Sequence, residues 1–491
     1  MDSILLIALL APPMFAAAVA ILARRAPVGA VWFDAAAMPV SAGAAAAIAL
    51  RLAAGGAPLV IGTAWRLDAL SALLALLVSV VATLAAWLGP GLERRGGVPG
   101  TEIRHFRIYA NLFASTMLMA VSTSNLGVMW VAIEATTVTS ALLIPLRRTK
   151  PALDASWKYL LICSVGIALA FAGTVLAFVD YATTGGDLEL ALNWTTLRTA
   201  APSLHPEVAQ LAFVFLLVGF GTKAGLAPTH TWLPDAHSEA PAQLSAVMSG
   251  VLLAVALYAV ARWKAIIDLA IGPAFTDTML LVVGMATVVV GSVSLLSQTY
   301  YKRMLAYSSI EHMGLACVGL ALGPPGVFAA LLHLTGHALA KSTAFLLSGR
   351  VYARYRSGKI GAVSGLLDTA PATGVLFAAT LFALAGLPPF SLFLSEILIV
   401  QAAWRTAHGV VTALVLVLIL LAFASLVTHL QRMLFGKAGR DEAGRDVLRG
   451  ERASVPLGIL ALPVVLLAWI GVMLPAPLRM LLTYAAEVVR P

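Results

Sequence analysis

Long apolar runs limit most strongly what this chain can fold into, because they recur from one end of it to the other. Short breaks rich in charged residues, proline or glycine separate them. Apolar residues make up 60% of the 491, and charged residues make up 11%. Soluble domains, by contrast, carry about 25% charged residues. The composition excludes a soluble enzyme, a nucleic-acid-binding protein and a disordered chain, and the pattern predicts an all-α polytopic membrane protein.

A helix that crosses a bilayer needs about 20 apolar residues, and the runs predict about fourteen transmembrane helices. The first run is followed by Arg24 and Arg25 and has no positive residue before it. A signal peptide shows the reverse charge order, so we expect this run to be retained as a span. The predicted spans cover residues 3–23, 31–54, 67–89, 107–122, 125–146, 156–180, 207–227, 240–262, 275–298, 304–322, 325–348, 371–402, 409–430 and 455–475.

The distribution of positive charge predicts the orientation of these spans. Of the 32 Lys and Arg residues, 22 lie in loops that follow odd-numbered spans and 8 lie in the other loops, while Lys223 and Lys341 lie inside spans. Cytoplasmic loops of membrane proteins are enriched in Lys and Arg. We therefore expect a bacterial-type cytoplasmic (inner) membrane location with both termini on the outer face. The polar stretch 436–454 is then a cytoplasmic loop, and 181–206 is an outer loop.

Ionisable side chains inside the spans are the candidate functional residues, because a charge at mid-bilayer costs roughly 2.5–3.5 kcal/mol on insertion scales. Glu134 lies in the middle of the fifth span. Its alternative role is that of a protonated carboxyl group satisfied by a neighbouring Ser or Thr. Lys223 lies in the seventh span, shortly before Pro228. Proline breaks helices, and broken helices at membrane depth line cavities or are buried in protein. The alternative for Lys223 is a side chain that extends to the membrane surface.

Three residues of the eleventh span, His333, His337 and Lys341, are spaced at i, i+4 and i+8 and share one helix face. A His-x-x-x-His pair can bind metal, but two ligands are too few and no third is evident in the sequence, so we expect no metal site. A proton relay fits better, because histidine titrates near neutral pH. A polar seam between helices is the alternative.

The twelfth span contains a second break, at residues 386–389, followed by Glu396. Glu311 and His312 lie early in the tenth span, where a position at the membrane interface and a part in the buried site are both open. Cys163 and Cys317 are too few for an iron–sulfur cluster or a structural zinc site. We expect both to be buried small residues and expect no cofactor in this chain.

The positions of these residues predict an internal repeat. Glu134 and Lys223 are 89 residues apart, and Glu311 and Glu396 are 85 apart. In each pair the second residue lies in a proline-broken span. The two sets are five spans apart, and five is odd, so they have opposite orientations, as in inverted-repeat transporters. The predicted domains are an N-terminal three-helix segment (1–106), two inverted five-helix repeats (107–262 and 275–430), and a cytoplasmic loop, final span and short C-terminal tail (431–491).

Five segments carry a resemblance to a known family, in which the WLPDAHSEAP run beside a lysine is highly specific. They are VMWVAIEATTVTSALLIP, VGFGTKAGLAPTHTWLPDAHSEAPAQLSAVMSGVLL, KRMLAYSSIEHMG, LLHLTGHALAKSTAFLLSG and GLPPFSLFLSEILI. The chain resembles the antiporter-like proton-translocating membrane subunits of complex I, of Mrp-type Na⁺/H⁺ antiporters and of energy-converting hydrogenases. It is most similar to the hydrogenase-4 (formate hydrogenlyase-type) component F subgroup.

The resemblance implies roles for the candidate residues. Glu134 and Lys223 match the family's glutamate and its partner lysine. The eleventh-span residues match the family's hydrophilic axis, and Glu396 matches the terminal residue from which protons leave. The main candidates are Glu134, Lys223, His333, His337, Lys341 and Glu396, and the accessory candidates are Lys158, His230, Asp235, His237, Glu311 and His312.

The resemblance also implies a proton-translocating subunit of a redox-driven complex that carries no redox centre itself. Other membrane subunits and a peripheral redox module are the expected partners, with Ni-Fe and iron–sulfur centres in those subunits. One departure is Ala254, which stands in the eighth span where complex I subunits commonly carry a Lys or His. The alternatives are an Mrp-type Na⁺/H⁺ antiporter subunit and a structural membrane anchor with an impaired channel.

Overall fold

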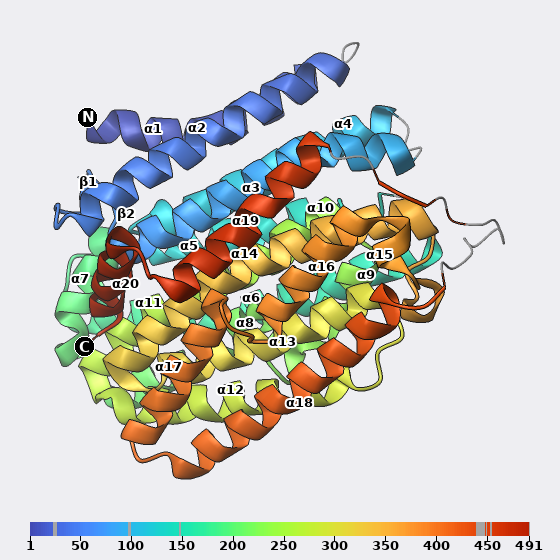
Figure 1. Ribbon diagram of the computed structural model, residues 1–491. Coiled ribbons are helices and arrows are strands. Elements are labelled where there is room, and N and C mark those ends of the chain that lie inside the picture. The colour runs from blue at the N-terminus through green and yellow to red at the C-terminus, as the bar shows by residue number, and fades with distance from the viewer. Residues whose placement is uncertain are drawn as a thin grey trace.

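The structure is a computed structural model that describes residues 1–22, 27–96, 100–146, 149–437, 447, 449–451 and 454–490. Long helices dominate these ranges, and most run side by side in one bundle (Figure 1). The unbroken ones are α1 (Asp2–Leu22), α2 (Pro27–Ala53), α3 (Ala69–Gly96), α4 (Gly100–Ser122), α5 (Leu126–Ala141), α6 (Lys150–Thr183), α12 (Pro273–Leu295), α13 (Tyr301–Leu320), α14 (Gly323–Tyr355), α18 (Gly409–Leu434) and α19 (Val455–Val472). The all-α membrane architecture predicted from the apolar runs is confirmed.

Every predicted span overlaps a helix or a broken helix pair. Within the described ranges, eight helices are long and apolar enough to cross a membrane, or nine if the bent pair 456–472 and 476–489 counts as one span. Helices outside that group are short, such as α5, or carry polar side chains, such as α14 with its two histidines and its lysine. The number fourteen therefore stays a prediction.

Both predicted helix breaks are present. In the seventh span, α8 (Pro206–Ala224) ends at Gly225, whose φ is +76°, and the chain resumes through η3 (Thr229–Thr231) into α9 (Trp232–Glu239). In the twelfth span, α16 (Pro371–Leu384) is followed by Gly386 at φ +68° and then by α17 (Ser391–Arg405). Each break combines a glycine in the left-handed region with prolines that cannot donate a backbone hydrogen bond.

The eighth span is interrupted in a way that the sequence did not indicate. It runs as α10 (Ala242–Val247), a π-helical turn η4 (Met248–Leu252) and α11 (Leu253–Ile271). All residues of its most apolar window are buried inside the chain. Single π-turns inside α-helices occur frequently at functional sites.

Smaller elements also lie outside the predicted spans. A hairpin joins β1 (Leu59–Ile61) to β2 (Trp65–Leu67) in antiparallel register. The predicted outer loop 181–206 contains η1 (Leu188–Leu190), α7 (Trp194–Ala200) and η2 (Ala201–Ser203). The turn η5 (Ile360–Ala362) and helix α15 (Leu366–Thr369) precede α16. The predicted short tail is the amphipathic helix α20 (Ala476–Val489), which buries one face against α3 and α14.

Helix α14 occupies the centre of this arrangement and packs against α3, α10, α13, α16 and α17. Figure 1 shows α1 and α2 at one edge of the bundle and α12 and α18 at the opposite edge, with both termini at the same end. Termini at one end agree with an even number of spans. Arg24, Arg25, Arg147, Arg148 and most of the predicted loop 436–454 lie outside the described residues.

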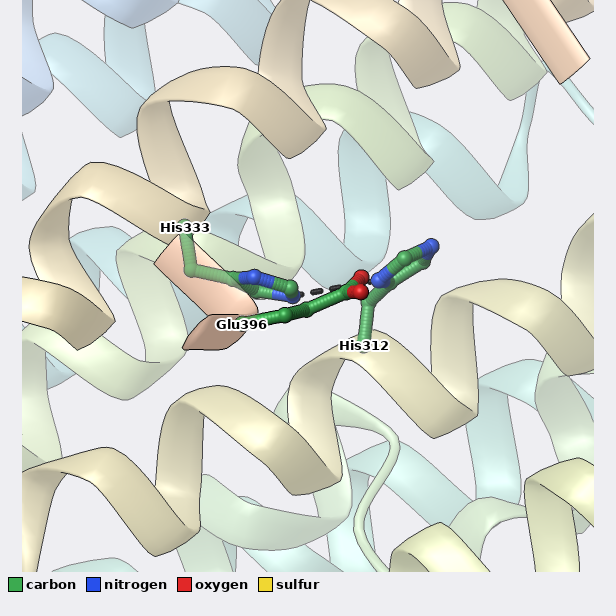
Figure 2. Close-up of side chains that lie close together, drawn as sticks. All are labelled: His312, His333 and Glu396. Carbon is green, nitrogen blue, oxygen red and sulfur yellow. Dashed lines mark hydrogen bonds between the residues drawn. The ribbon is translucent and has the colours of Figure 1, made fainter. Parts of the chain in front are cut away.

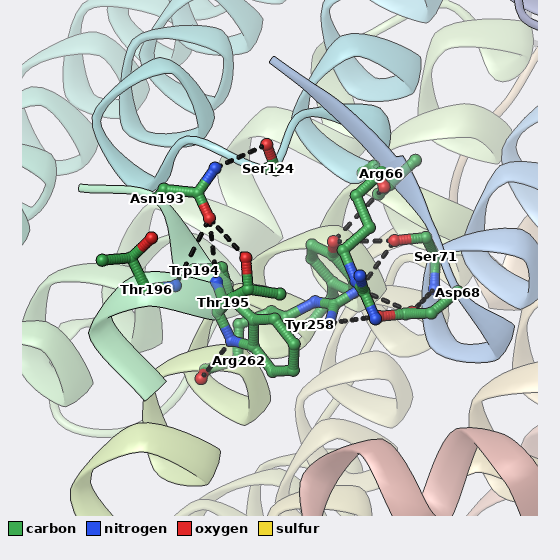
Figure 3. Close-up of polar contacts among 11 residues, drawn as sticks. Arg66, Asp68, Ser71, Ser124, Asn193, Trp194, Thr195, Thr196, Tyr258 and Arg262 are labelled. Atoms are coloured by element: carbon green, nitrogen blue, oxygen red, sulfur yellow. Dashed lines mark hydrogen bonds and ion pairs between the residues drawn. The ribbon is translucent and has the colours of Figure 1, made fainter. Parts of the chain in front are cut away.

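A buried ion pair holds three distant segments together near the β-hairpin (Figure 3). Arg262 of α11 donates to both carboxylate oxygens of Asp68, with Nη1–Oδ2 at 2.7 Å and Nη2–Oδ1 at 2.6 Å. Its guanidinium also lies over the ring of Trp194 in α7, 4.6 Å from the ring centroid. Burial, the largest influence on the pKa of Asp68, opposes ionisation, but the charge and hydrogen bonds of Arg262 hold that pKa below its ordinary value.

We expect Asp68→Asn to destabilise the chain, because it leaves the buried Arg262 guanidinium without a balancing charge. Removing one partner of a buried pair costs about 3–5 kcal/mol. Thermal unfolding in detergent, followed by tryptophan fluorescence, measures the loss. The matched control is Asp2→Asn, whose partner Arg51 and whose own side chain are both about one third exposed, and which is expected to cost at most about 1 kcal/mol. Equal losses in the two variants would contradict the structural role of the pair.

Candidate functional site

Lys223 lies in the last turn of α8, directly before the break, and its side chain is fully buried. Its ammonium Nζ donates to the hydroxyl of Thr137 at 2.8 Å and to that of Tyr159 at 2.6 Å. Nζ also lies 4.7 Å from the centroid of the Tyr159 ring. The alternative of a lysine extending to the membrane surface is wrong, because α5 and α6 enclose the side chain and supply its acceptors.

Glu134 is linked to Lys223 through one hydroxyl group. Its Oε2 accepts from Thr137 Oγ1 at 3.1 Å, and its Oε1 accepts from Ser164 Oγ at 2.9 Å. Thr137 thus accepts a hydrogen bond from Lys223 and donates one to Glu134. The two residues predicted as a pair are connected by this bridge, and the neighbouring Ser and Thr expected in the alternative reading are both present.

Glu134 also lies at the border of an exposed apolar flank. Its carboxylate is only partly buried in this chain. On the same helix, Val131 is 54% exposed and Val138 is 49% exposed. Neighbouring α6 exposes Leu161 and Val165. Lys223 is therefore enclosed by the chain, while its hydrogen-bonded neighbour Glu134 reaches toward the outside of the bundle.

The second half of the site lies on α14, where His333, His337 and Lys341 are all fully buried. The Lys341 ammonium donates to the backbone carbonyl of Leu305 on α13 at 2.9 Å. Ser309 donates to the same carbonyl at 3.0 Å and contacts the hydroxyl of Ser249 at 2.7 Å. Because the Ser309 hydrogen is used on the carbonyl, Ser249 of the π-turn donates to Ser309. A polar connection therefore runs from the eighth span to Lys341.

His312, His333 and Glu396 meet where α13, α14 and α17 approach one another (Figure 2). One ligand-type atom from each of the three lies within 4.8 Å of the others. His312 Nδ1 and His333 Nε2 are 3.1 Å apart. This group differs from the His-x-x-x-His pair considered in the sequence. Donors from two other helices join His333, while His337 stays outside the trio.

Glu311 and His312 are buried inside the chain, at 2% and 0% exposure. The Glu311 carboxylate lies 3.6 Å from His312 Nδ1. The ring of His337 is inclined at 61° to that of His312, with ring centroids 5.5 Å apart. These contacts make the eleventh-span residues part of a cluster built from several helices.

Glu396 lies against the second helix break. A Cβ atom added at Gly386 would collide with the Glu396 carboxylate, so only glycine leaves room for it. Gly386 also has positive φ, which disfavours side chains independently of space. The break therefore both redirects the twelfth span and makes room for the carboxylate.

The remaining accessory candidates lie apart from these two groups. Lys158 and Arg303 each form an ion pair with Asp235 at 3.0 Å, and the three side chains are partly exposed. His237 is buried and stacks on Phe345 of α14, with ring centroids 5.0 Å apart. His230 lies on η3 and is half-buried. Both cysteines are buried and unpaired, as expected.

Sequence reasoning missed the hydroxyl groups that connect the charged residues. Thr137 stands three positions after Glu134, a spacing at which helix side chains interact, and that spacing could have identified it. Tyr159, Ser249, Ser309 and Ser395 carry no such signal, because their partners come from other helices.

Comparison with known proteins gives consistent similarities. The family model described as "NADH:quinone oxidoreductase/Mrp antiporter, TM" matches residues 123–422. A hydrogenase-4 component F homolog of Methylacidiphilum infernorum is 38% identical over 348 residues, covering 70% of this chain and 72% of that protein. Hydrogenase-4 component B of Escherichia coli is 28% identical over 344 residues, covering 67% of this chain, which spans about half (49%) of that relative.

Among solved structures, a chain of the Mrp complex from Dietzia sp. DQ12-45-1b superposes with a TM-score of 0.86. The match covers 99% of this chain and 97% of the other, at 22% sequence identity. This likeness concerns the fold, including the helices on both sides of the two breaks.

We expect Gly386→Ala to lower stability, because a side chain at this left-handed position costs about 1–2 kcal/mol and also displaces Glu396. The apparent melting temperature of the purified chain in detergent measures the change. Gly409→Ala is the matched control, because a Cβ there meets nothing within 4 Å, and its effect should stay within about 0.5 kcal/mol. A Gly386→Ala protein as stable as the control would show that the carboxylate does not need this gap.

Proposed function

We propose that this chain, which belongs to the NADH:quinone oxidoreductase/Mrp antiporter transmembrane family, translocates protons as a subunit of a redox-driven membrane complex. It is an antiporter-like membrane subunit of the type found in hydrogenase, complex I and Mrp assemblies. The observation that carries the proposal is the fully buried Lys223, joined by one hydroxyl to Glu134. The balance between the protonated and neutral forms of a buried ammonium with so few partners is sensitive to any change in neighbouring charge.

In the first half of the path, the Lys223–Thr137–Glu134 bridge couples two charges across one hydroxyl group. A negative Glu134 stabilises the protonated form of Lys223, and loss or movement of that charge favours release of the proton. The partly exposed position of Glu134 makes it the end of the bridge that a neighbouring subunit would reach.

In the middle of the path, the π-turn compensates for Ala254. Ser249 and Ser309 lead to the Leu305 carbonyl that also holds Lys341. The carbonyl accepts from both Ser309 and Lys341 and has no proton to pass on, so water would carry the proton between these two groups, where complex I subunits commonly use a lysine or histidine. The break after Lys223 is the place where water would enter this region.

In the last part, the proton passes from Lys341 along His337 and His333 toward Glu396. The buried contact between His312 and His333, with Glu396 within reach, provides a short chain of groups that can accept and donate protons. These five side chains come from three helices, so small shifts of α17 relative to α14 change their contacts. The accessory residue Glu311 adds a carboxylate to the same region.

The energy for proton translocation would come from partner subunits of the complex. The similarity to a hydrogenase-4 component F homolog supports other membrane subunits and a peripheral redox module with Ni-Fe and iron–sulfur centres as partners. Their electron transfer would reach this chain by electrostatic or conformational coupling. We place it in a bacterial-type cytoplasmic membrane with both termini outside, and divide it into the segments 1–106, 107–262, 275–430 and 431–491.

An Mrp-type Na⁺/H⁺ antiporter subunit is the second candidate, because the fold superposes on a chain of an Mrp complex. Mild-detergent purification of the tagged chain, with mass spectrometry and metal analysis, separates the two. Nickel, iron and several membrane subunits support the redox-driven complex. Small hydrophobic partners without metal, together with sodium-dependent proton exchange, support the antiporter. Unchanged coupling in Lys223→Ala would instead favour a structural anchor.

We expect Thr137→Val to reduce the initial rate of proton translocation by about tenfold or more, because hydrogen bonds to charged groups contribute about 1.5–3 kcal/mol. Valine keeps the shape and removes the bridge. Thr139→Val is the matched control, since the Thr139 hydroxyl bonds only to backbone carbonyls of its own helix. Fluorescence quenching of a pH-sensitive dye in vesicles that contain the complex measures both rates. Similar losses in the two variants would mean that the bridge has no specific role.

Glu134→Gln tests the other end of the bridge. It should lower proton translocation while electron transfer in the partner subunits stays detectable, because glutamine keeps the size of the side chain but cannot supply the charge and can accept only one of the two hydrogen bonds. Substrate turnover and dye quenching, measured in the same vesicles, separate the two effects. Unchanged pumping in this variant would defeat the pairing of Glu134 with Lys223.

A further inference from the structure

The cluster of His312, His333 and Glu396 has the features of a metal site as well as those of a proton path. Its three donors come from α13, α14 and α17, and all three side chains are at least nine-tenths buried. Two imidazoles and a carboxylate are a ligand set of Zn²⁺ sites that keep an open fourth position. The sequence separates them too widely for any motif to reveal the set.

The spacing of the donor atoms fits a tetrahedral ion. Zn–N distances of about 2.0–2.1 Å place two ligand nitrogens about 3.3 Å apart at the tetrahedral angle. His312 Nδ1 and His333 Nε2 are 3.1 Å apart, so a shift of a few tenths of an ångström admits the ion. The Glu396 carboxylate is within 4.8 Å of both nitrogens and reaches them by small side-chain rotations.

The hydrogen bonds around His333 prepare one nitrogen as a ligand. Ser395 donates its only hydroxyl hydrogen to the Leu392 carbonyl at 2.8 Å. The contact between Ser395 Oγ and His333 Nδ1, at 2.9 Å, therefore requires that Nδ1 carries the hydrogen. In a neutral His333 the lone pair then lies on Nε2, the atom that faces His312. Metal-binding histidines are oriented in this way by a hydrogen bond from their other nitrogen.

The surroundings supply charge and a further donor. The Glu311 carboxylate lies 3.6 Å from His312 Nδ1, so two carboxylates stand close to the ligand nitrogens. Both ring nitrogens of His337 lack a hydrogen-bond partner among the described residues, and its ring contacts that of His312. Pro388 and Pro389 of the neighbouring second break are exposed.

We propose that His312, His333 and Glu396 bind a divalent transition-metal ion, Zn²⁺ before all others, and that the bound ion blocks proton transfer to Glu396. The binding half rests on geometry alone, and the blocking half rests on the proposed function. An ion held there occupies the lone pairs of His312 and His333 and a carboxylate oxygen of Glu396. Those are the atoms that would accept protons, so the path stops until the ion leaves.

Zn²⁺ binding to the purified full chain, in competition with a chromophoric indicator, tests the site directly. One tight site per chain is expected, and Co²⁺ in its place should give the visible absorption of a four-coordinate ion. His333→Gln should weaken Zn²⁺ binding by more than about 100-fold, and Ser395→Ala, which removes only the orienting contact, by about 10- to 100-fold. His429→Gln is the matched control, because His429 is buried on α18 and bonded to the Leu295 carbonyl.

The results separate the two halves of the proposal. No tight site, or a site unaffected by both His333→Gln and Ser395→Ala, overturns metal binding. With the site present, added Zn²⁺ should inhibit proton translocation in vesicles at least tenfold, and Ser395→Ala, which leaves the groups of the proton path in place, should shift the inhibitory concentration by the same factor as the affinity. Binding without inhibition overturns the block. A wild-type complex that moves no protons refutes the proposed function, and the binding result then stands independently.

Discussion

A buried ammonium group needs oxygen acceptors within reach, and two such groups shape the interior of this chain. Lys223 obtains its acceptors from the side chains of α5 and α6, and its own helix stops one residue later. Lys341 obtains its acceptor from the backbone of α13. In a medium without water an unpartnered polar group costs several kcal/mol. The packing of α5, α6 and α13 around α8 and α14 is therefore inseparable from the solvation of these two lysines.

The two halves meet this demand with different chemistry. Around Lys223 the partners are hydroxyl groups, and the nearest carboxylate borders an open apolar flank. Around Lys341 the neighbours are imidazoles and carboxylates in a closed interior. Each half nevertheless contains a span broken by a glycine of positive φ and prolines. The two similarly broken spans thus support different sites, one whose carboxylate borders the outside of the bundle and one that is enclosed in its interior.

The sequence predicts the features that depend on local pattern. Apolar runs marked the helices, prolines marked both breaks, and four-residue spacing placed His333, His337 and Lys341 on one face. What it could not predict depends on packing between helices. His312 and Glu396 reach His333 only because α13 and α17 flank α14. The Asp68–Arg262 pair joins residues far apart in the chain. The helix α20 was missed because its apolar residues cover one face only and form no continuous run.

The π-turn at Met248–Leu252 bears on how members of this family are compared residue by residue. Each residue of an α-helix advances the side-chain direction by roughly 100°, and a wider turn changes that phase for everything after it. Ala254 is the second residue after the turn. In a relative whose eighth span is a regular helix, the residue written in the same alignment column faces a different neighbour. Relatives can therefore differ at this span in the direction of a side chain as well as in its identity, and a sequence alignment shows only the identity.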